Sequence, residues 1–167
     1  MIKKEKKFKW LEEGSKGENV ILLHGLMGGV ENFGDMVNYI SKECKVYGLD
    51  LRLFEGIKLN VSVKKLSDYL YSFMNHLNIK KAVLIGNSMG GHIGLIFAKE
   101  HPEMVKGLIL TGSSGLFENS MGDSFPRRGD YNYIKKKTEE VFYDPKVATK
   151  ELVDRVFKLA NNRINLL

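Results

Sequence analysis

The sequence predicts an α/β protein built on a mostly parallel sheet with helices on both faces. Between residues 19 and 115, short apolar runs of strand length alternate with longer segments whose apolar residues recur at helical spacing. This alternation is typical of an open parallel sheet, because a helix returns the chain between neighbouring parallel strands. Glycine-bearing loops follow three of the apolar runs, near Gly25, Ser88 and Gly112. Ligands of such sheets bind beyond the carboxyl ends of the strands, so we expect the functional site there.

The chain before residue 81 supplies five elements of this pattern. We expect a short edge strand at 8–13, a buried strand at 19–23, a helix at 31–41, a strand at 45–51 and a long helix after Ser62, with a loop at 52–60. Ser62 is a good N-cap, because its hydroxyl can accept a hydrogen bond from an unpaired N–H of the first turn. The apolar residues of the two helices keep helical spacing. They are Phe33, Met36, Val37 and Ile40 in the first helix, and Val63, Leu66, Leu70, Phe73, Met74 and Leu77 in the second.

Residues 81–98, KAVLIGNSMGGHIGLIFA, join a buried strand directly to a helix. Ser88 stands at the turn with Gly86 and Gly90 two residues to either side, which is the G-x-S-x-G nucleophile elbow. The glycines let strand and helix approach closely around a strained residue. The turn lifts the Ser88 hydroxyl above the strand end and puts the Met89 N–H in the first helical turn, where a developing oxyanion is favoured.

Glycine-rich turns between a strand and a helix also bind phosphate, which is the alternative for this stretch. The stretch lacks the lysine of a Walker A loop, and its glycines at 86, 90, 91 and 94 do not fit the G-x-G-x-x-G spacing. The pattern therefore favours a nucleophilic serine.

The chain changes character near residue 115. A further strand is expected at 105–110, after which residues 117–133 have little periodicity and many turn formers. Two helices are expected at 133–142 and 149–160, separated at Asp144-Pro145. We therefore expect an α/β core at 1–115 and a helical cap or lid at 116–167.

Composition is that of an ordinary globular domain of 167 residues, with 43% hydrophobic and 28% charged residues and a net charge of +6. The lysine clusters at 3–7 and 135–137 have carboxylates nearby, so we expect solvated faces and no binding of nucleic acid. No apolar run has the ~20 residues of a membrane span, and no secretory signal is expected. The single cysteine, Cys44, fits a reducing compartment, so we expect a cytoplasmic protein. No metal spacing is present, and no metal or cofactor is expected.

From residue 19 to about 115, the chain resembles the α/β-hydrolase superfamily. The resemblance rests on a series of elements in a fixed order. A strand leads into the His24-Gly25-Leu26 loop, a second strand ends in Asp50, and a helix precedes the motif Gly86-Asn87-Ser88-Met89-Gly90-Gly91. This last motif is similar to the elbow motif of carboxylesterases and of carbon–carbon bond hydrolases acting on meta-cleavage products. The segment after Gly115 resembles the family's cap, and the fold is expected to be incomplete.

The resemblance implies roles for individual residues. Ser88 would be the nucleophile that forms an acyl-enzyme, and the backbone N–H groups of Leu26 and Met89 would form the oxyanion hole. Gly25, Gly86 and Gly90 would shape the loop and the elbow. A serine at the elbow argues against haloalkane dehalogenases and epoxide hydrolases, whose relatives carry aspartate there.

The family's acid and histidine are not found after Ser88 at strand-end positions. We expect His24 to shape its loop, and His76 and His101 to lie at the surface. His92 is nearest to Ser88 along the helix, but its direction is expected to take it toward the sheet or sideways. Glu118 and Asp123 are weak candidates for the acid. We therefore expect little turnover from these residues alone, and association with a missing C-terminal segment, a second chain or another copy.

Two functions of different classes follow. The first is a serine hydrolase that cleaves a small apolar carboxylic ester as part of a completed enzyme, with carbon–carbon bond hydrolysis as the alternative within the family. The second is a non-catalytic binding module that keeps the fold and has lost the catalytic residues. An intact elbow favours the first, because binding alone does not need a strained serine.

Overall fold

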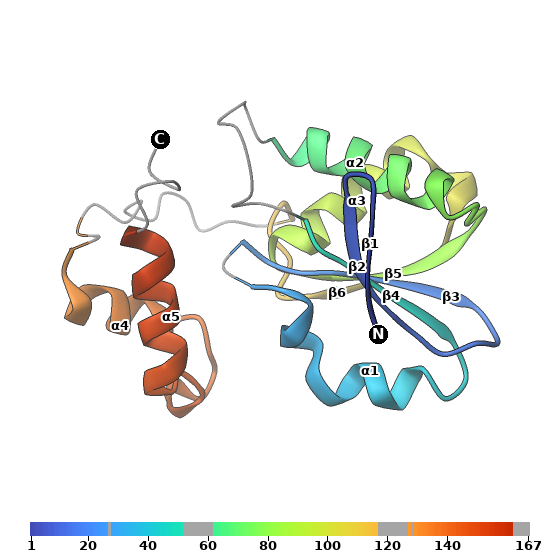
Figure 1. Cartoon of the computed structure of the whole chain (residues 1–167). Helices are drawn as coiled ribbons and strands as arrows, with labels where there is room; N and C mark the ends of the chain where they lie inside the picture. The colour runs from blue at the N-terminus through green and yellow to red at the C-terminus, as the bar shows by residue number, and fades with distance from the viewer. Residues whose placement is uncertain (27, 52–61, 117–126, 128, 162–167) are drawn as a thin grey trace. The chain divides into compact units, whose positions relative to one another are not determined.

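The computed structural model describes all residues except 27, 52–61, 117–126, 128 and 162–167 (Figure 1). The chain divides into two compact units, Met1–Glu118 and Asn119–Leu167. This division falls close to the boundary expected after residue 115. The loop expected at 52–60 and the acid candidates Glu118 and Asp123 lie outside the described residues.

The first unit contains a six-stranded mixed sheet in the order β1-β2-β4-β3-β5-β6. The strands are β1 (Ile2–Glu5), β2 (Phe8–Glu13), β3 (Asn19–Leu23), β4 (Lys45–Leu49), β5 (Ala82–Asn87) and β6 (Val105–Thr111). Strands β4, β3, β5 and β6 are parallel, whereas β1 and β2 are antiparallel to their neighbours. The mostly parallel sheet expected from the sequence is therefore confirmed.

Residues 8–13 form the expected strand, β2, but the expectation that this strand lies at the edge of the sheet is wrong. Strand β2 lies between β1 and β4, and β1 occupies the edge. The sequence of β1, IKKE, has no apolar run that marks it as a strand. It is held by main-chain pairing with β2 across a tight turn in which Lys6 has a φ of 51°.

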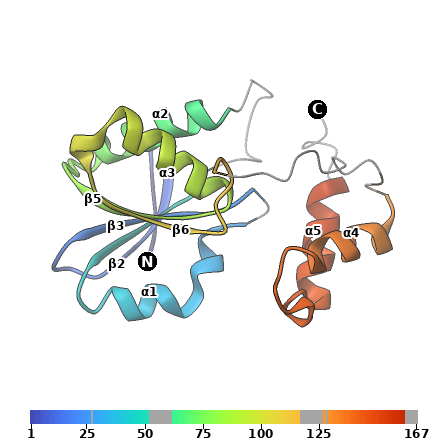
Figure 2. The ribbon, with the colours of Figure 1, turned by 180° about the vertical axis from the view of Figure 1, so that it is seen from behind.

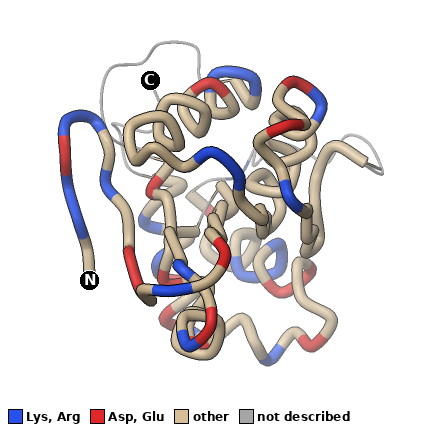
Figure 3. The backbone as a smooth tube through the Cα atoms, turned by 90° about the vertical axis from the view of Figure 1, so that its right-hand side faces the viewer, with Lys and Arg blue, Asp and Glu red and all other residues tan. Residues whose placement is uncertain are grey.

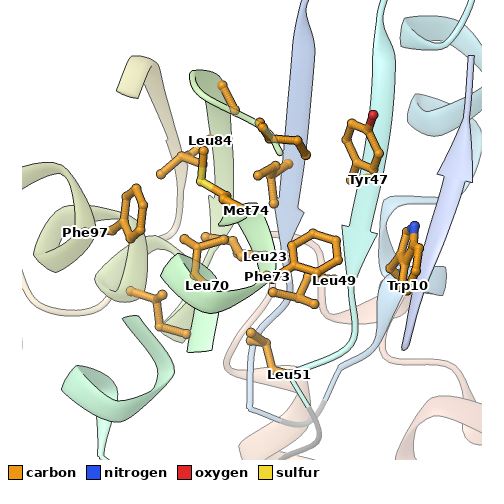
Figure 4. Packing of buried hydrophobic residues seen from close by; sticks show 14 of the residues in the cluster. Trp10, Leu23, Tyr47, Leu49, Leu51, Leu70, Phe73, Met74, Leu84 and Phe97 are labelled. Atoms are coloured by element: carbon orange, nitrogen blue, oxygen red, sulfur yellow. The ribbon is translucent and has the colours of Figure 1, made fainter. Parts of the chain in front are cut away.

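Helices cover both faces of this sheet (Figures 1 and 2). Helices α2 (Val63–His76) and α3 (Met89–Glu100) pack on one face, where the larger core contains Trp10, Phe73 and Phe97 (Figure 4). The 3₁₀ helix η1 (Val30–Phe33) and α1 (Gly34–Ile40) pack on the other face, around Val37. The short helix η2 (Pro102–Met104) leads into β6.

Most helical predictions for this unit hold, with one interruption. The Ser62 hydroxyl accepts a hydrogen bond from the Lys65 N–H at 3.2 Å, which confirms the N-cap of α2. The helix expected at 31–41 is divided into η1 and α1 at Gly34, whose φ of 42° departs from helical geometry. The strand expected at 45–51 ends at Leu49.

The second unit is helical, with α4 (Tyr131–Glu139), the 3₁₀ helix η3 (Pro145–Val147) and α5 (Lys150–Asn161). Ile134, Val156 and Ala160 form its small core. Asp130 caps α4 by accepting a hydrogen bond from the Tyr133 N–H at 3.1 Å, so α4 begins two residues before the predicted start. The break expected at Asp144-Pro145 separates the two helices.

Basic and acidic residues both occur along the backbone of the described chain (Figure 3). Lys3 pairs with Glu12 at 3.0 Å, and Lys137 pairs with Glu140 at 2.9 Å. Both lysine clusters noted in the sequence are thus interleaved with carboxylates. Within the described ranges, no helix combines the length and the apolar character that a membrane span requires.

Candidate active site

Ser88 occupies a strained turn between β5 and α3. Its backbone angles are φ 53° and ψ −119°, a region that residues with a Cβ rarely adopt. The residue is half-buried, and its hydroxyl makes no capping hydrogen bond to the helix that begins at Met89. The elbow predicted from the G-x-S-x-G spacing is therefore present as a backbone conformation.

Glycines permit the close approach on both sides of Ser88. A Cβ on Gly86 would lie 2.6 Å from the backbone of Gly90, and a Cβ on Gly90 would lie 2.0 Å from the carbonyl oxygen of Leu23. A Cβ on Gly25 would lie 3.2 Å from the Cβ of Ser88. The loop after β3 therefore lies directly against the turn at Ser88.

The two amide groups expected to form an oxyanion hole belong to the segments that meet here. Met89 is the first residue of α3, so its N–H has no carbonyl partner within the helix. Leu26 is in the loop after β3, and the residue is 47% exposed. Among the described residues, neither N–H donates a hydrogen bond to another group. Met27, which follows in the loop, is not described.

The segment after β6 also holds the elbow, and the sequence did not indicate this. The Ser88 N–H donates to the Thr111 carbonyl at 3.1 Å, and the Ser114 N–H donates to the Ser88 carbonyl at 3.2 Å. The Asn87 side-chain amide donates to the carbonyl and hydroxyl of Thr111 at 3.0 and 3.2 Å. The only signal in the sequence was the turn-forming segment Thr111-Gly112-Ser113-Ser114-Gly115 at the end of a strand.

His24 shapes the loop after β3, as expected. The side chain is buried, and its Nε2 accepts a hydrogen bond from the Leu51 N–H at 3.0 Å. The neutral ring therefore carries its hydrogen on Nδ1, which lies 2.9 Å from the Gly25 carbonyl oxygen. Both ring nitrogens are thus engaged with the main chain on either side of the site.

His76 and His101 are held by groups other than the Ser88 hydroxyl. His76 lies 3.1 Å from a Glu5 carboxylate oxygen and stacks on Phe8, with only 16% of its side chain exposed. The expectation that it is a surface residue is wrong, because β2 supplies aromatic rings that cover it. His101 stacks on Tyr71 with ring centroids 4.4 Å apart, and its side chain is 26% exposed.

His92 lies one turn along α3 from Ser88 and packs against the segment that follows β6. A Cβ on Gly115 would lie 2.5 Å from His92 Cδ2, so the ring rests against that residue. In the described part of the chain, no hydrogen bond joins the His92 ring to Ser88. This placement matches the sideways direction expected from the sequence.

The chemistry available at this edge is that of a half-buried serine beside two amide groups that donate to no other group among the described residues. Within the described ranges, no cluster of three His, Cys, Asp or Glu residues is arranged to hold a metal ion. Amide donors at a helix N-terminus stabilise negative charge on a neighbouring oxygen. The arrangement suits attack on a carbonyl carbon, provided that a base removes the Ser88 proton.

Known proteins share this sequence and architecture. The chain is 32% identical over 149 residues to a 2-hydroxy-6-oxo-6-(2'-aminophenyl)hexa-2,4-dienoic acid hydrolase of Metapseudomonas resinovorans, with 80% of this chain and 51% of that protein covered. It is 31% identical over 157 residues to a dihydrolipoyllysine-residue acetyltransferase component of the acetoin cleaving system of Pseudomonas putida, with 90% and 42% covered. The chain thus spans about half the length of these curated relatives.

Solved structures give the same result. An α/β hydrolase enzyme from the metagenome of sediments of the Mar Chica lagoon, Morocco, superposes with a TM-score of 0.74 at 34% identity. The match covers 99% of this chain and 61% of that protein. The family model described as the alpha/beta hydrolase fold matches residues 18–141, from just before β3 into the second unit. Since that match covers well over half of the sequence, the chain belongs to the α/β-hydrolase family.

Proposed function

We propose that Ser88 is the nucleophile of a serine hydrolase that cleaves a small apolar carboxylic ester. The observation that supports this most directly is the strained Ser88 backbone, with φ 53° and ψ −119°, beside the Met89 N–H, which has no carbonyl partner within its helix. Strain of this kind is kept at functional sites, where it fixes the direction of a reacting group. A domain that only bound ligands would gain stability by losing it.

The proposed reaction begins with attack of the Ser88 oxygen on the ester carbonyl carbon. The hydroxyl proton passes to a base, and the carbonyl electron pair moves onto an oxygen that accepts hydrogen bonds from the Leu26 and Met89 N–H groups. Collapse of this intermediate expels the alcohol and leaves an acyl group on Ser88. Water then releases the acid. Loss of one oxyanion donor typically raises the barrier by ~3 kcal/mol.

The base and its supporting acid are proposed to come from a segment outside these 167 residues or from a second chain. The placement of the histidines supports this. His24 is bound to Leu51 and Gly25, His76 to Glu5, and His101 is stacked on Tyr71. A cytoplasmic location is part of the proposal, and the free thiol of Cys44 is consistent with it.

Carbon–carbon bond hydrolysis is the second candidate. It is favoured by the 32% identity to a hydrolase of a 2-hydroxy-6-oxo-dienoic acid and by the sequence of the elbow, Gly-Asn-Ser-Met-Gly-Gly. The same hydroxyl and amide donors would serve either reaction, so rates on the two substrate types distinguish them.

The test is covalent labelling by a fluorophosphonate probe in the longest native polypeptide that contains these residues. We expect labelling and hydrolysis of p-nitrophenyl acetate by the wild type, and loss of both in Ser88→Ala. Ser114→Ala is the matched control, because it removes a neighbouring hydroxyl and keeps the main-chain bond to Ser88. Labelling that survives Ser88→Ala, or a wild type that shows neither signal, overturns the proposal. A 2-hydroxy-6-oxo-dienoate tested beside the ester decides between the two hydrolases.

A further inference from the structure

The main chain of Ser88 is held from two directions. On the helix side, the Gly91 and His92 N–H groups donate to its carbonyl at 3.0 and 3.2 Å. On the β6 side, the Ser88 N–H donates to the Thr111 carbonyl, and the Ser114 N–H donates to the Ser88 carbonyl. The helix would supply the first pair for any residue at its start. The second pair depends on residues 111–114 being fixed beside the elbow.

The Thr111 side chain ties that segment to the two residues that precede Ser88. Its hydroxyl accepts from the Asn87 Nδ2 at 3.2 Å and donates to the Gly86 carbonyl oxygen at 3.4 Å. The same Asn87 nitrogen donates to the Thr111 carbonyl at 3.0 Å. That carbonyl therefore accepts from both Asn87 and Ser88. One threonine thus contacts three consecutive residues of the elbow.

Asn87 also faces the loop on the other side of the elbow. A Cβ on Gly25 would lie 3.3 Å from the Asn87 Oδ1. The Asn87 amide therefore lies between the end of β6, to which it donates hydrogen bonds, and the loop after β3, which carries Leu26.

We propose that Thr111 is a positioning residue for the nucleophile, acting through Asn87 and through the Ser88 main chain. A strained backbone persists only where its surroundings determine it from several sides. On this side the β5–β6 main-chain pairing is supplemented by the Thr111 hydroxyl, whose contacts with Asn87 and Gly86 come from neither the helix nor the glycines. The effect on catalysis rests on the proposed function of Ser88, whereas the effect on elbow geometry does not.

The first experiment follows amide hydrogen exchange by NMR in the 167-residue chain. Thr111→Val removes the hydroxyl at nearly constant volume, and Thr111→Ser keeps it. We expect exchange at the Ser88 and Ser114 amides to become roughly two- to tenfold faster in Thr111→Val, the range expected for loss of one net hydrogen bond. Thr111→Ser should restore the wild-type rates. The Leu22 and Val46 amides in the central strands report global opening and should not change.

The geometric part is overturned if Thr111→Val leaves Ser88 and Ser114 unchanged, or if Thr111→Ser exchanges as fast as Thr111→Val. It is also overturned if all amides, including Leu22 and Val46, accelerate together, because the threonine then acts on global stability alone. Asn87→Ala should reproduce Thr111→Val, and the double variant should show less than the product of the two effects, since the residues share one contact.

The second experiment measures the rate of fluorophosphonate labelling in the longest native polypeptide. Thr111→Val should label several-fold more slowly than both the wild type and Thr111→Ser, with the slope of rate against pH unchanged. Equal labelling of Thr111→Val and wild type overturns the catalytic part. A wild type that does not label at all rejects the proposed function instead, while the exchange measurement still decides whether Thr111 positions the elbow.

Discussion

The carbonyl oxygen of Leu23 lies so close to Gly90 that a Cβ added to this glycine would be only 2.0 Å from it. The first turn of α3 therefore rests directly on the end of β3. We predict that Gly90→Ala lowers the free energy of unfolding by about 3 kcal/mol or more, because backbone must move to admit the methyl group. Urea unfolding followed by circular dichroism measures this.

Gly94→Ala is the matched control on the same helix. Among the described residues, the contact given for a Cβ there is with the Leu108 Cδ1, at 2.8 Å, which is the end of a flexible side chain. Alanine also favours helix over glycine by about 1 kcal/mol. Gly94→Ala should be near neutral. Equal losses in the two variants would show that the contact with Leu23 does not limit residue 90.

The strained backbone conformation of Ser88 is predicted to lower the stability of the fold. Its φ of 53° disfavours any residue with a Cβ, so Ser88→Gly should raise the free energy of unfolding by about 1 kcal/mol relative to Ser88→Ala. Both variants lack the hydroxyl, so the comparison isolates the backbone. Thermal or urea unfolding of the pair measures it, and a less stable Ser88→Gly would contradict the strain.

His24 is predicted to be structural rather than a base. His24→Ala leaves the buried Leu51 N–H without its acceptor and opens a cavity, for a loss of about 2–4 kcal/mol. His24→Gln should lose less, since its amide oxygen can occupy the place of Nε2. Unfolding free energies of the two variants test this. If both lose the same amount, the hydrogen bond to Leu51 contributes little.

Glu12 is predicted to link stability to pH. Burial raises the pKa of its carboxyl, but the hydrogen bonds from Trp10 and Lys3, together with the Lys3 charge, outweigh this and lower it overall. A lowered pKa stabilises the fold above the unfolded value of about 4.3, and this contribution is lost as the pH falls below it.

Glu12→Gln should therefore show a weaker fall in unfolding free energy between about pH 5 and pH 3 than the wild type. Chemical unfolding at several pH values provides the two curves. Parallel curves would show that the contacts with Trp10 and Lys3 do not favour the ionised form.

Ile109 is predicted to contribute to association. It lies on the edge strand β6 opposite Ile85, and it is 49% exposed. Exposed edges with apolar side chains favour pairing with another chain or segment. Ile109→Lys should therefore lower self-association in sedimentation velocity. Tyr39→Lys, at a residue 75% exposed on α1, is the control. Equal effects of the two would argue against the edge.

The sequence indicated those features of the fold that have local causes. The Ser62 cap, the apolar face of α2 and the elbow at Ser88 each depend on residues within one turn or one strand. The alternation of short apolar runs with segments of helical spacing likewise predicted the parallel part of the sheet. The position of His92 in the helix that follows Ser88 also predicted that its side chain points away from the serine.

Features made by residues distant in the chain could not be predicted in this way. Strand β1 has no apolar run, so only its pairing with β2 reveals it. His76 is covered by Phe8, which lies far away in sequence. The bond between Asn87 and Thr111 spans 24 residues, and neither side chain carries a signal for the other.

The central place of β3 affects how the protein is made. Asn19, at its start, donates a hydrogen bond to the carbonyl of Lys81, 62 residues later. During translation, β3 can pair only with β4 until β5 has been synthesised, because β5 is the second neighbour of β3. Late pairing of this kind slows folding and leaves the nascent chain open to chaperones during translation.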